Sequence, residues 1–493
     1  MLWMSPWAIT LVQLKNKLEK MEQKKQSTNT PVTPSANHEA DVVVIGAGLT
    51  GLTAAFYLTR GGKNVAMIET SDRVGGQIHS HRVGDFIFES GPNTGAISYP
   101  EVVRLFEDLK PSCELEEAHK SSKRRLIWKG HKFHELPSGP ISGLRTPLFT
   151  WHDKIRILFE PWRKKGTNPN ESVGDMAARR LGKSFVDYAV DPFLSGVYAS
   201  DPDRLPTRLA LPKLYNLEQN YGSFIRGALA KLKERKSTAD RMATKGVFSA
   251  RGGLSNLTNA LAQSIGMDRI HTSAQNVSVM PKDKGWVATF RAKDGIETTI
   301  ACQRVVTTCP AYALPALLPF IDKAQMAKLS NLYYAPIVQI GVGLTNHRGI
   351  KYNAFGGLVP SKEHKKVLGI LFPSACFDGR APKEGVSYTF FLGGTRHPGY
   401  VEKSDEELKK IIDDTLHDML KYPADMHADS IQIYRHKRAI PQYELSSQER
   451  FDTIEELAAQ YPTLTIAGNL WGGIGMADRI KQAVGVAKDI NRG

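Results

Sequence analysis

The sequence predicts an α/β fold in which a domain of parallel strands and helices carries an antiparallel sheet and a helical lobe. Three observations lead to this prediction. A β-branched run, a glycine-rich turn and a helical pattern follow one another around residue 50. Residues 149–235 are mostly helical in pattern. Strands with alternating apolar residues begin near residue 277 and suggest an antiparallel meander, in which Glu297–Ile300 and Arg304–Thr308 are expected as two short strands. The change between a 3.6-residue and a two-residue period distinguishes helices from strands.

The first element is a strand, turn, helix and second strand within residues 41–69. The turn has the pattern Gly-x-Gly-x-x-Gly, whose glycines allow a tight turn, close approach of a pyrophosphate and close packing of the helix. The helix N-terminus offers unpaired N–H groups to phosphates, and Glu69 can accept hydrogen bonds from a ribose. We predict a dinucleotide site with these members: Gly46, Ala47, Gly48, Leu49, Thr50, Gly51 and Glu69.

Two further segments narrow the choice of dinucleotide. An Arg-x-Gly-Gly pattern follows Glu69, and a strand, glycine-rich turn and helix lie near the C-terminus. This arrangement resembles the FAD-containing amine oxidase superfamily, in which the last turn and its helix face the flavin ring. That family often has Asp at the position of Asn469, and it packs a backbone valine near the adenine, although an ordinary sheet valine would look the same as Val277. The resemblance implies FAD as the cofactor, with these additional contacts: Thr70, Arg73, Gly76, Gln77, Val277, Asn469, Gly473, Ile474, Gly475 and Met476.

Four other segments carry a narrower resemblance. Glu89–Thr94 is similar to the Gly-Pro-Asn-Ser element of the protoporphyrinogen oxidases, above all the plant mitochondrial type, and Val190–Pro202 is similar to their Pro-Phe-x-x-Gly loop. Phe355–Glu363 and Tyr388–Gly394 also resemble that family, so the resemblance covers about residues 41–490. It implies a Rossmann-like FAD domain of the two-dinucleotide-binding type. It also implies further flavin contacts, which are Gly91, Pro92, Asn93 and Thr94.

The resemblance implies a reaction and a set of substrate contacts. Protoporphyrinogen oxidases remove six electrons from protoporphyrinogen IX by hydride transfer to the flavin, which yields protoporphyrin IX for heme synthesis. Because the flavin carries out this chemistry, we expect no catalytic side chain and no metal site. By alignment with the family, Leu358 and Leu371 enclose one pyrrole ring and Phe391 stacks on another. Gly196 and Ala199 are expected beside the reacting bridge carbon.

Arg124 aligns with the arginine that binds a propionate in this family. A guanidinium can bind a carboxylate through two hydrogen bonds, which suits that role. Lys123 and Arg125 make the whole segment basic, and a solvated basic run would look the same. The sequence therefore predicts that Arg124→Ala raises KM much more than Arg125→Ala.

The chain is basic, with 65 Lys and Arg against 50 Asp and Glu and a formal net charge of +15. Between Lys120 and Lys165 basic residues interleave with large apolar ones, which suits a membrane surface. The family binds membranes peripherally through its helical domain, whereas a helix that buries its apolar face within its own domain is the alternative. The residues concerned are Phe149, Trp151, Lys154, Ile155, Arg156, Leu158, Phe159, Trp162, Arg163, Lys164 and Lys165.

Two further partners are considered from the sequence. The net charge would suit nucleic acid, but no nucleic-acid-binding signature is found. No stretch has the roughly 18 uninterrupted apolar residues of a spanning helix. We expect a cytoplasmic protein that associates peripherally with the inner membrane surface, a tetrapyrrole substrate, and O₂ or a quinone as electron acceptor; a homodimer stays open.

The expected domains follow from these motifs and from the coarse pattern of strands and helices. Residues 1–13 are moderately apolar but lack the features of a signal peptide, and residues 14–38 are polar. We expect residues 1–38 to be a disordered or extraneous tail, with a membrane-contacting anchor as the alternative. The remaining expectations are a discontinuous FAD domain of residues 41–118, 245–312 and 455–493, a substrate domain of residues 119–135 and 313–454, and a helical, membrane-associating domain of residues 136–244.

Three alternatives remain at this point. Coproporphyrinogen III, with four carboxylates, is a second substrate candidate, but the expected set of Arg124 and apolar contacts favours a dicarboxylate. An amine oxidase or carotenoid desaturase is less compatible with the Pro-Phe-x-x-Gly loop. A flavin-free binding protein is the third alternative, and a yellow colour of the purified protein would exclude it.

Overall fold

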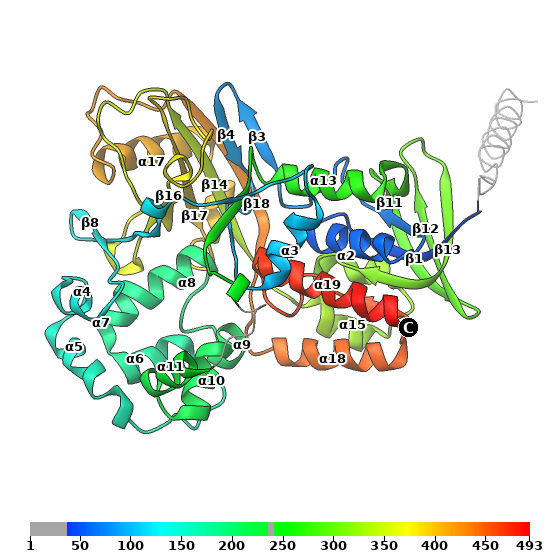
Figure 1. The fold of residues 1–493 in the computed structure, drawn as a ribbon, viewed down its shortest axis with the longest axis horizontal. Helices are drawn as coiled ribbons and strands as arrows, with labels where there is room; N and C mark the ends of the chain where they lie inside the picture. Colours follow the sequence, from blue (N-terminus) through cyan, green and yellow to red (C-terminus); the bar gives the residue numbers. More distant parts are fainter. Residues whose placement is uncertain (1–36, 235–240) are drawn as a thin grey trace, which may run out of the picture.

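A computed structural model of the protein describes residues 37–234 and 241–493 (Figure 1). The tail expected over residues 1–38 lies outside the described residues, except for its last two, which belong to strand β1. Within the described ranges, no helix is long and apolar enough to cross a bilayer.

The first sheet is mainly parallel and has the order β10-β2-β1-β13, with β19 also paired to β13. Two antiparallel strands, β12 and β11, continue it beyond β13. Its parallel strands are rich in β-branched residues because helices cover both faces of the sheet. The strands are β1 (Asn37–Ile45), β2 (Val65–Ile68), β10 (Ile270–His271), β11 (Gln275–Lys282), β12 (Gly285–Arg291), β13 (Glu297–Thr307) and β19 (Leu464–Ile466).

The sequence correctly predicts the antiparallel meander after residue 276, but two strand bounds differ from the prediction. β1 begins four residues before Asp41, because Asn37–Ala40 pair with Thr299–Cys302 of β13. Two short strands were expected over residues 297–308, whereas β13 is one strand of 11 residues. It stays continuous because it pairs with β1 along its length, with β12 near its start and with β19 near its end.

Helices pack on both faces of this sheet (Figure 1). One layer shares a core with residues such as Val42 and Val44, and the other shares a core with Val43 and Ile45, as expected for alternating sides of a strand. The first layer contains α2 (Leu49–Arg60), α3 (Pro100–Asp108), α13 (Ser255–Ile265) and α19 (Met476–Arg492). The second contains α14 (Leu314–Leu317), α15 (Lys323–Ser330) and α18 (Ser447–Gln460).

The second large sheet has the order β18-β14-β17-β16-β15-β7-β8. It is antiparallel except between β15 and β7, which run parallel. Helix α17 (Asp405–Asp418) packs its apolar side against one face, and the other face is directed toward the first domain. Its strands are β7 (Arg125–Lys129), β8 (Lys132–Glu135), β14 (Tyr334–Leu344), β15 (Gly356–Leu358), β16 (Gly369–Leu371), β17 (Val386–Gly393) and β18 (Ser430–Pro441).

A lobe of short helices lies below the second sheet in Figure 1. Its interior contains a buried ion cluster in which Arg180 lies between Glu160 and Glu218, with N–O distances of 3.1 and 3.2 Å. The helices are α4 (Pro140–Arg145), α5 (Trp151–Leu158), α6 (Val173–Leu181), α7 (Lys183–Phe185), a π-turn (Val186–Val190), α8 (Asp191–Val197), α9 (Thr207–Ala210), α10 (Pro212–Tyr221) and α11 (Phe224–Lys233).

Short elements connect these parts. A hairpin of β3 and β4 crosses from the first domain to the second sheet, and a small sheet of β5, β9 and β6 lies beside α3 and α13. The bounds are β3 (Ser80–Val83), β4 (Phe86–Glu89), β5 (Gly95–Ala96), β6 (Leu115–Glu117), β9 (Val247–Ala250) and α16 (Pro373–Cys376). Short 3₁₀ turns occupy Lys120–Lys123, Glu160–Trp162, Met267–Arg269, Ala311–Ala313, Ser361–Glu363 and Pro398–Glu402.

Candidate functional site

Two glycine-rich turns meet at the carboxyl edge of the first sheet. β1, β2, β13 and β19 are parallel, so their carboxyl ends lie at one edge. α2 and α19 pack together and run in the same direction, because Asn491 near the end of α19 donates a hydrogen bond to the carbonyl oxygen of Tyr57 in α2 at 3.2 Å. The N-termini of both helices therefore point to the edge where ligands bind in open α/β sheets.

The first turn is shaped by its glycines. Gly46 has φ +99°, which favours glycine, and a Cβ on Gly51 would lie 1.9 Å from the carbonyl oxygen of Gly46. Gly48 is the N-cap of α2 and has no side chain to satisfy the first N–H groups of the helix. A Cβ on Gly76 would lie 3.1 Å from Cα of Gly48, so the two backbones leave a surface free of side chains. Such a surface fits a pyrophosphate.

Glu69 is placed at the end of β2 beside this turn. Its carboxylate is 7% exposed and accepts hydrogen bonds from the N–H groups of Ala47 at 2.7 Å and Ser71 at 2.8 Å. Thr70 next to it is exposed. A carboxylate held in this way retains lone pairs for a ribose, so the residues present fit the dinucleotide predicted from the sequence.

The guanidinium of Arg73 is bonded to backbone carbonyl oxygens, unlike that of an arginine left free for a phosphate. Its guanidinium donates to the carbonyl oxygens of Gly76 at 2.8 Å and Ile78 at 3.1 Å, which fixes the turn that faces Gly48. Gln77 in the same turn donates to the carbonyl oxygen of Ala439 on β18 at 3.3 Å. The segment therefore joins the first domain to the second sheet, and a direct contact between Arg73 and a cofactor stays a prediction.

Val277 lies at an irregular point of β11. The register between β11 and β12 shifts between Gln275 and Ser278, so that Val277 has no partner in that ladder. Nearby, the N–H of Ala274 donates to the carbonyl oxygen of Glu69 at 2.9 Å. Val277 follows this contact by three residues in the chain, and its contact with an adenine stays a prediction.

The turn after β19 is held by residues that the sequence analysis did not identify. Tyr443 donates to the carbonyl oxygens of Asn469 and Gly473, each at 3.0 Å. Buried Arg450 donates to the carbonyl oxygen of Leu470 at 2.9 Å, and buried Arg479 donates to the carbonyl oxygens of Gly468 and Trp471. No local pattern distinguishes these side chains, because their acceptors are backbone atoms of a turn that tertiary packing brings to them.

Asn469 and Gly475 lie in the turn after β19, where flavin contacts were predicted. The side-chain oxygen of Asn469 accepts from the Tyr334 hydroxyl at 3.3 Å, and its amide N–H₂ remains a potential donor. Gly475 is the N-cap of α19 and again has no side chain, while its N–H donates to the Asp478 carboxylate at 3.1 Å. Ile474 and Met476 flank this cap.

The segment from Glu89 to Asn93 links the two domains. Glu89 is buried and accepts from the N–H of Leu254 at 2.9 Å and from the Ser80 hydroxyl at 2.7 Å. Burial raises the pKa of Glu89, and these two hydrogen bonds oppose that rise. On the other side, Thr389 of β17 donates to the Asn93 side-chain oxygen at 3.0 Å, and Gln339 of β14 donates to the Glu89 carbonyl oxygen.

The second sheet presents an incompletely covered apolar face to this segment. Leu358 of β15, Gly369 of β16 and Phe391 of β17 are direct partners in one row, and Leu371 lies two residues further along the same face. Leu358, Leu371 and Phe391 are half-buried, whereas the residues that alternate with them on β16 and β17 are buried. The three predicted substrate residues therefore share one face.

A small cavity connects that face to the predicted flavin segment. Asn93 and Thr94 line it from one side, and Leu371 and Phe355 line it from the other. Arg380 also lines the cavity and forms a buried ion pair with Glu116 at 3.1 Å. The structure thus brings predicted cofactor and substrate residues into one site.

Arg124 and Arg125 have different positions relative to this face. Arg125 pairs with Gly356, which pairs with Leu371, so Arg125 lies in the Leu371 row and on the same face. Its side chain is exposed, and its guanidinium lies 4.5 Å from the ring centre of Phe355. It forms no ion pair with any residue of the described ranges. Arg124 precedes the strand, is half-exposed and pairs with Glu135 at 2.9 Å.

Helix α8 and the residues after it up to Pro202, here called the α8 loop, close the other side of the site. A Cβ on Gly196 would lie 2.4 Å from Cδ2 of Leu358, and Ala199 has φ +53°. Arg396 holds this loop through two hydrogen bonds to Asp201 at 3.0 Å and a further ion pair with Asp191. Burial opposes the charge of Asp201, but the bond from Arg396 holds its pKa below the usual value. Gly196 and Leu358 thus lie against each other, and their contacts with the substrate stay predictions.

Comparisons with known proteins agree with this architecture. The family model of flavin-containing amine oxidoreductases matches residues 49–491. Protoporphyrinogen oxidase 2 of Arabidopsis thaliana is 30% identical and covers 89% of this chain and 91% of its own, and human protoporphyrinogen oxidase is 29% identical with 89% and 96% covered. A solved structure from Exiguobacterium sp. 255-15, described as a candidate protoporphyrinogen oxidase, has a TM-score of 0.74 at 20% identity and covers 93% of this chain and all of its own.

Proposed function

The chain belongs to the flavin-containing amine oxidoreductases and, within them, to the protoporphyrinogen oxidases, and from this premise we propose that it oxidises protoporphyrinogen IX to protoporphyrin IX. It is an FAD-dependent oxidoreductase. The observation that carries the proposal is the half-covered apolar face of Leu358, Leu371 and Phe391 beside Asn93 and Thr94. A flat, mostly apolar ring with two carboxylates fits such a face.

The roles of the protein's own residues follow from the geometry. Bound FAD accepts two electrons at a time as a hydride, so six electrons require three cycles. The glycine turns and Glu69 would hold the dinucleotide, and the apolar face would orient the tetrapyrrole and exclude water. Because Gly196 has no side chain, the α8 loop can lie close to Leu358. No side chain from this position would separate the loop from the tetrapyrrole.

A fluorescence assay tests the proposal. Purified protein is given protoporphyrinogen IX or coproporphyrinogen III in air, each with and without added FAD and a quinone. Rapid porphyrin formation from protoporphyrinogen alone is the expected result, and the quinone arm shows whether O₂ suffices as acceptor. Preferred oxidation of coproporphyrinogen III, or a colourless protein that does not bind FAD, would contradict the proposal.

The arginine beside the apolar face is proposed to bind a propionate. Because Arg125 shares this face and has no ion-pair partner in the described ranges, we expect Arg125→Ala to raise KM for protoporphyrinogen by about 10-fold or more, the scale of a lost bond between charged groups. Arg124 is on the sequence-based list, yet its side chain is engaged by Glu135. Arg124→Ala should change KM by about threefold or less.

Steady-state kinetics of the two variants checks this expectation, with kcat and flavin content measured in parallel. A larger KM effect of Arg124→Ala would restore the assignment made from the sequence. Equal small effects of both variants would show that neither arginine binds the substrate carboxylate.

Association with a membrane surface is proposed for the outer side of α4, α5 and the following turn. The sequence left open whether the apolar residues of this stretch are buried, and the structure exposes most of them. Phe149 is an exception, because it is buried and stacks on Phe185 with the two ring centres 3.7 Å apart. Lys154 is also buried. Of the predicted apolar residues, those exposed are Trp151, Ile155, Leu158, Phe159 and Trp162, and Ile141 and Leu144 of α4 are exposed as well. An exposed apolar patch bordered by basic residues suits a lipid interface.

Co-sedimentation with anionic vesicles checks this proposal. We expect the full chain to pellet with vesicles at low salt, and Trp151→Ser combined with Ile155→Ser and Trp162→Ser to pellet at least about 10-fold less, because each large side chain contributes about 1.5–3 kcal/mol when buried. Met267→Ser with Met280→Ser is a matched control, since both residues are exposed on the first domain. Unchanged pelleting of the triple variant would contradict the assignment of this face.

A further inference from the structure

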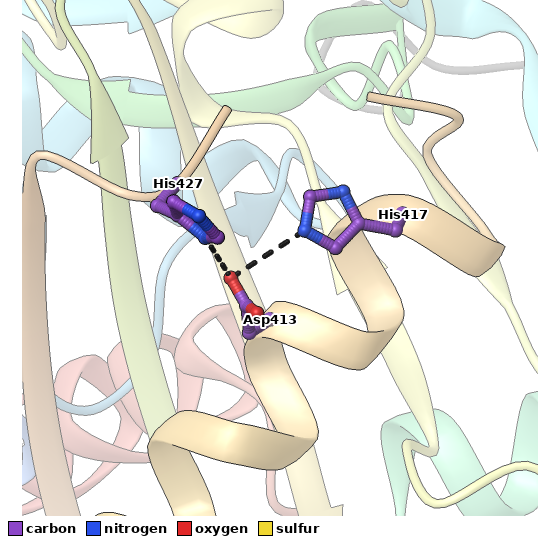
Figure 2. A group of neighbouring side chains, drawn as sticks. All are labelled: Asp413, His417 and His427. Atoms are coloured by element: carbon purple, nitrogen blue, oxygen red, sulfur yellow. Dashed lines mark hydrogen bonds and ion pairs between the residues drawn. The ribbon is translucent and has the colours of Figure 1, made fainter. Parts of the chain in front are cut away.

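Three metal-ligating side chains converge at the far end of the second sheet, outside the site described above. Asp413 and His417 are one turn apart on α17, and His427 lies in the loop that enters β18 (Figure 2). His427 Nδ1–H donates to Asp413 Oδ1 at 2.7 Å, a proton that a bound metal would displace, and His417 Nε2 lies 3.6 Å from the same oxygen. One ligand atom from each residue lies within 4.8 Å of the other two. We propose that these residues bind one divalent metal ion of the zinc class.

The hydrogen bond of His417 prepares it for this role. Its Nδ1 lies 3.0 Å from the carbonyl oxygen of Tyr422, so the Nδ1–H donates to that oxygen. The Nε2 lone pair is then directed toward Asp413 (Figure 2). Metal-binding histidines commonly donate their second ring nitrogen to a backbone carbonyl, which fixes the tautomer and the ring orientation. The protein thus orients one ligand without the metal.

The charge of Asp413 supports the same conclusion. Its acidic neighbours Asp414, Asp418 and Asp425 each pair with a lysine or an arginine. Across the described ranges of the chain, Asp413 is paired with the two histidines alone. A divalent ion at this position would offset the carboxylate charge.

The distances and elements indicate a structural site. A tetrahedral zinc ion has bonds of about 2.0–2.1 Å, so its ligand atoms lie about 3.3 Å apart. This separation falls between the distances of 2.7 and 3.6 Å from Asp413 Oδ1 to the two histidine nitrogens. The ion would connect the end of α17 to the loop before β18. Along β18, about 30 Å separate Ser430 from Ala439, which contacts Gln77 of the flavin segment, so the ion stabilises the sheet and takes no part in the reaction.

Titration of the untagged full chain with Zn²⁺ and Co²⁺ tests this inference, after removal of metal by a chelator. We expect one equivalent of Zn²⁺ by calorimetry, a rise in Tm with added Zn²⁺, and the intense visible absorption of tetrahedral Co²⁺. His417→Ala and His427→Ala should each weaken binding about 10-fold or more, since even outer partners of a metal site contribute 10–100-fold. The flavin spectrum and porphyrin formation should not change.

Two matched controls make the test specific. His152→Ala removes a histidine that pairs with Asp153 at 3.2 Å without a third ligand in the described ranges, and Asp414→Asn removes a neighbouring charge on α17. Both should bind Zn²⁺ as the unaltered chain does. Absence of binding, equal binding by His417→Ala, or a weak octahedral Co²⁺ spectrum would each overturn the inference.

Discussion

Alanine in place of Gly51 is expected to yield a protein that no longer retains FAD. The added Cβ would lie 1.9 Å from the carbonyl oxygen of Gly46 and 3.0 Å from Oγ1 of Thr308. The first of these atoms belongs to the backbone of the phosphate turn, so the helix and the turn must separate. Overpacking of this kind costs about 1–3 kcal/mol and occasionally more, and here it also moves the N–H groups that would bind the pyrophosphate.

Flavin absorbance after purification and FAD titration of the apoprotein measure this effect, for which we expect at least about 10-fold weaker binding, since 1.4 kcal/mol corresponds to a factor of ten. Gly485→Ala is the matched control, because Gly485 lies within α19 and an added Cβ would meet no atom within 4 Å. That variant should retain FAD and gain slightly in helix stability. A yellow, fully active Gly51→Ala protein would contradict the proposed position of the pyrophosphate.

The second large effect is expected from Arg180→Met in the helical lobe. Arg180 is fully buried between Glu160 and Glu218, which are also buried, and its removal leaves their charges without this partner. Breaking a buried ion pair on one side typically costs about 3–5 kcal/mol. Hydrogen exchange in α6, α10 and α11 should report this loss, while the first domain and its flavin should be little affected.

Arg179→Met provides the comparison for this variant. Arg179 is partly exposed and pairs with Glu171 and Glu218, and its loss leaves Arg180 in place between the buried carboxylates. We expect the smaller destabilisation from Arg179→Met. Similar protection of the lobe in the unaltered chain and in Arg180→Met would show that the cluster does not stabilise it.

Acid should weaken the same cluster. Burial opposes the charge of Glu218, but the hydrogen bond from Arg179, the N–H of Gly166 and the nearby Arg180 hold its pKa below the usual value. A carboxyl whose folded pKa is lowered binds protons more readily when unfolded. Its contribution to the stability of the lobe is therefore present above the usual pKa of Glu and is lost as the pH falls through the lower folded value.

The sequence predicted those parts of the site that depend on local order. The turn from Gly46 to Gly51 and the position of Glu69 follow from strand, turn and helix within one short segment, and the structure places them as expected. Leu358, Leu371 and Phe391 were predicted through resemblance, and they share one face. Arg124 was assigned by alignment with the family, and that assignment stays a prediction. Arg124 precedes the strand and pairs with Glu135, whereas Arg125 shares the face of Leu371, and for this reason we propose Arg125 as the propionate ligand.

Other features could not be predicted, because they arise only in the folded chain. Arg450 and Arg479 hold the turn after β19 through backbone carbonyls, and a basic residue in a helix carries no signal of such acceptors. The periodicity of α5 is the same whether its apolar side is buried or exposed. His427 reaches Asp413 only because the loop before β18 returns to α17.

The packing of α2 against α19 also affects how the protein folds during its synthesis. α2 is synthesised early. Helix α19, which lies beside it, and strand β19, which joins the same sheet, come from a segment that begins only at Leu464. Contacts so distant in sequence form only after a large loop has closed. During synthesis, the early βαβ unit therefore keeps part of its apolar surface uncovered until β19 and α19 have been made. We expect truncation within α19 to destabilise α2 and the turn before it first.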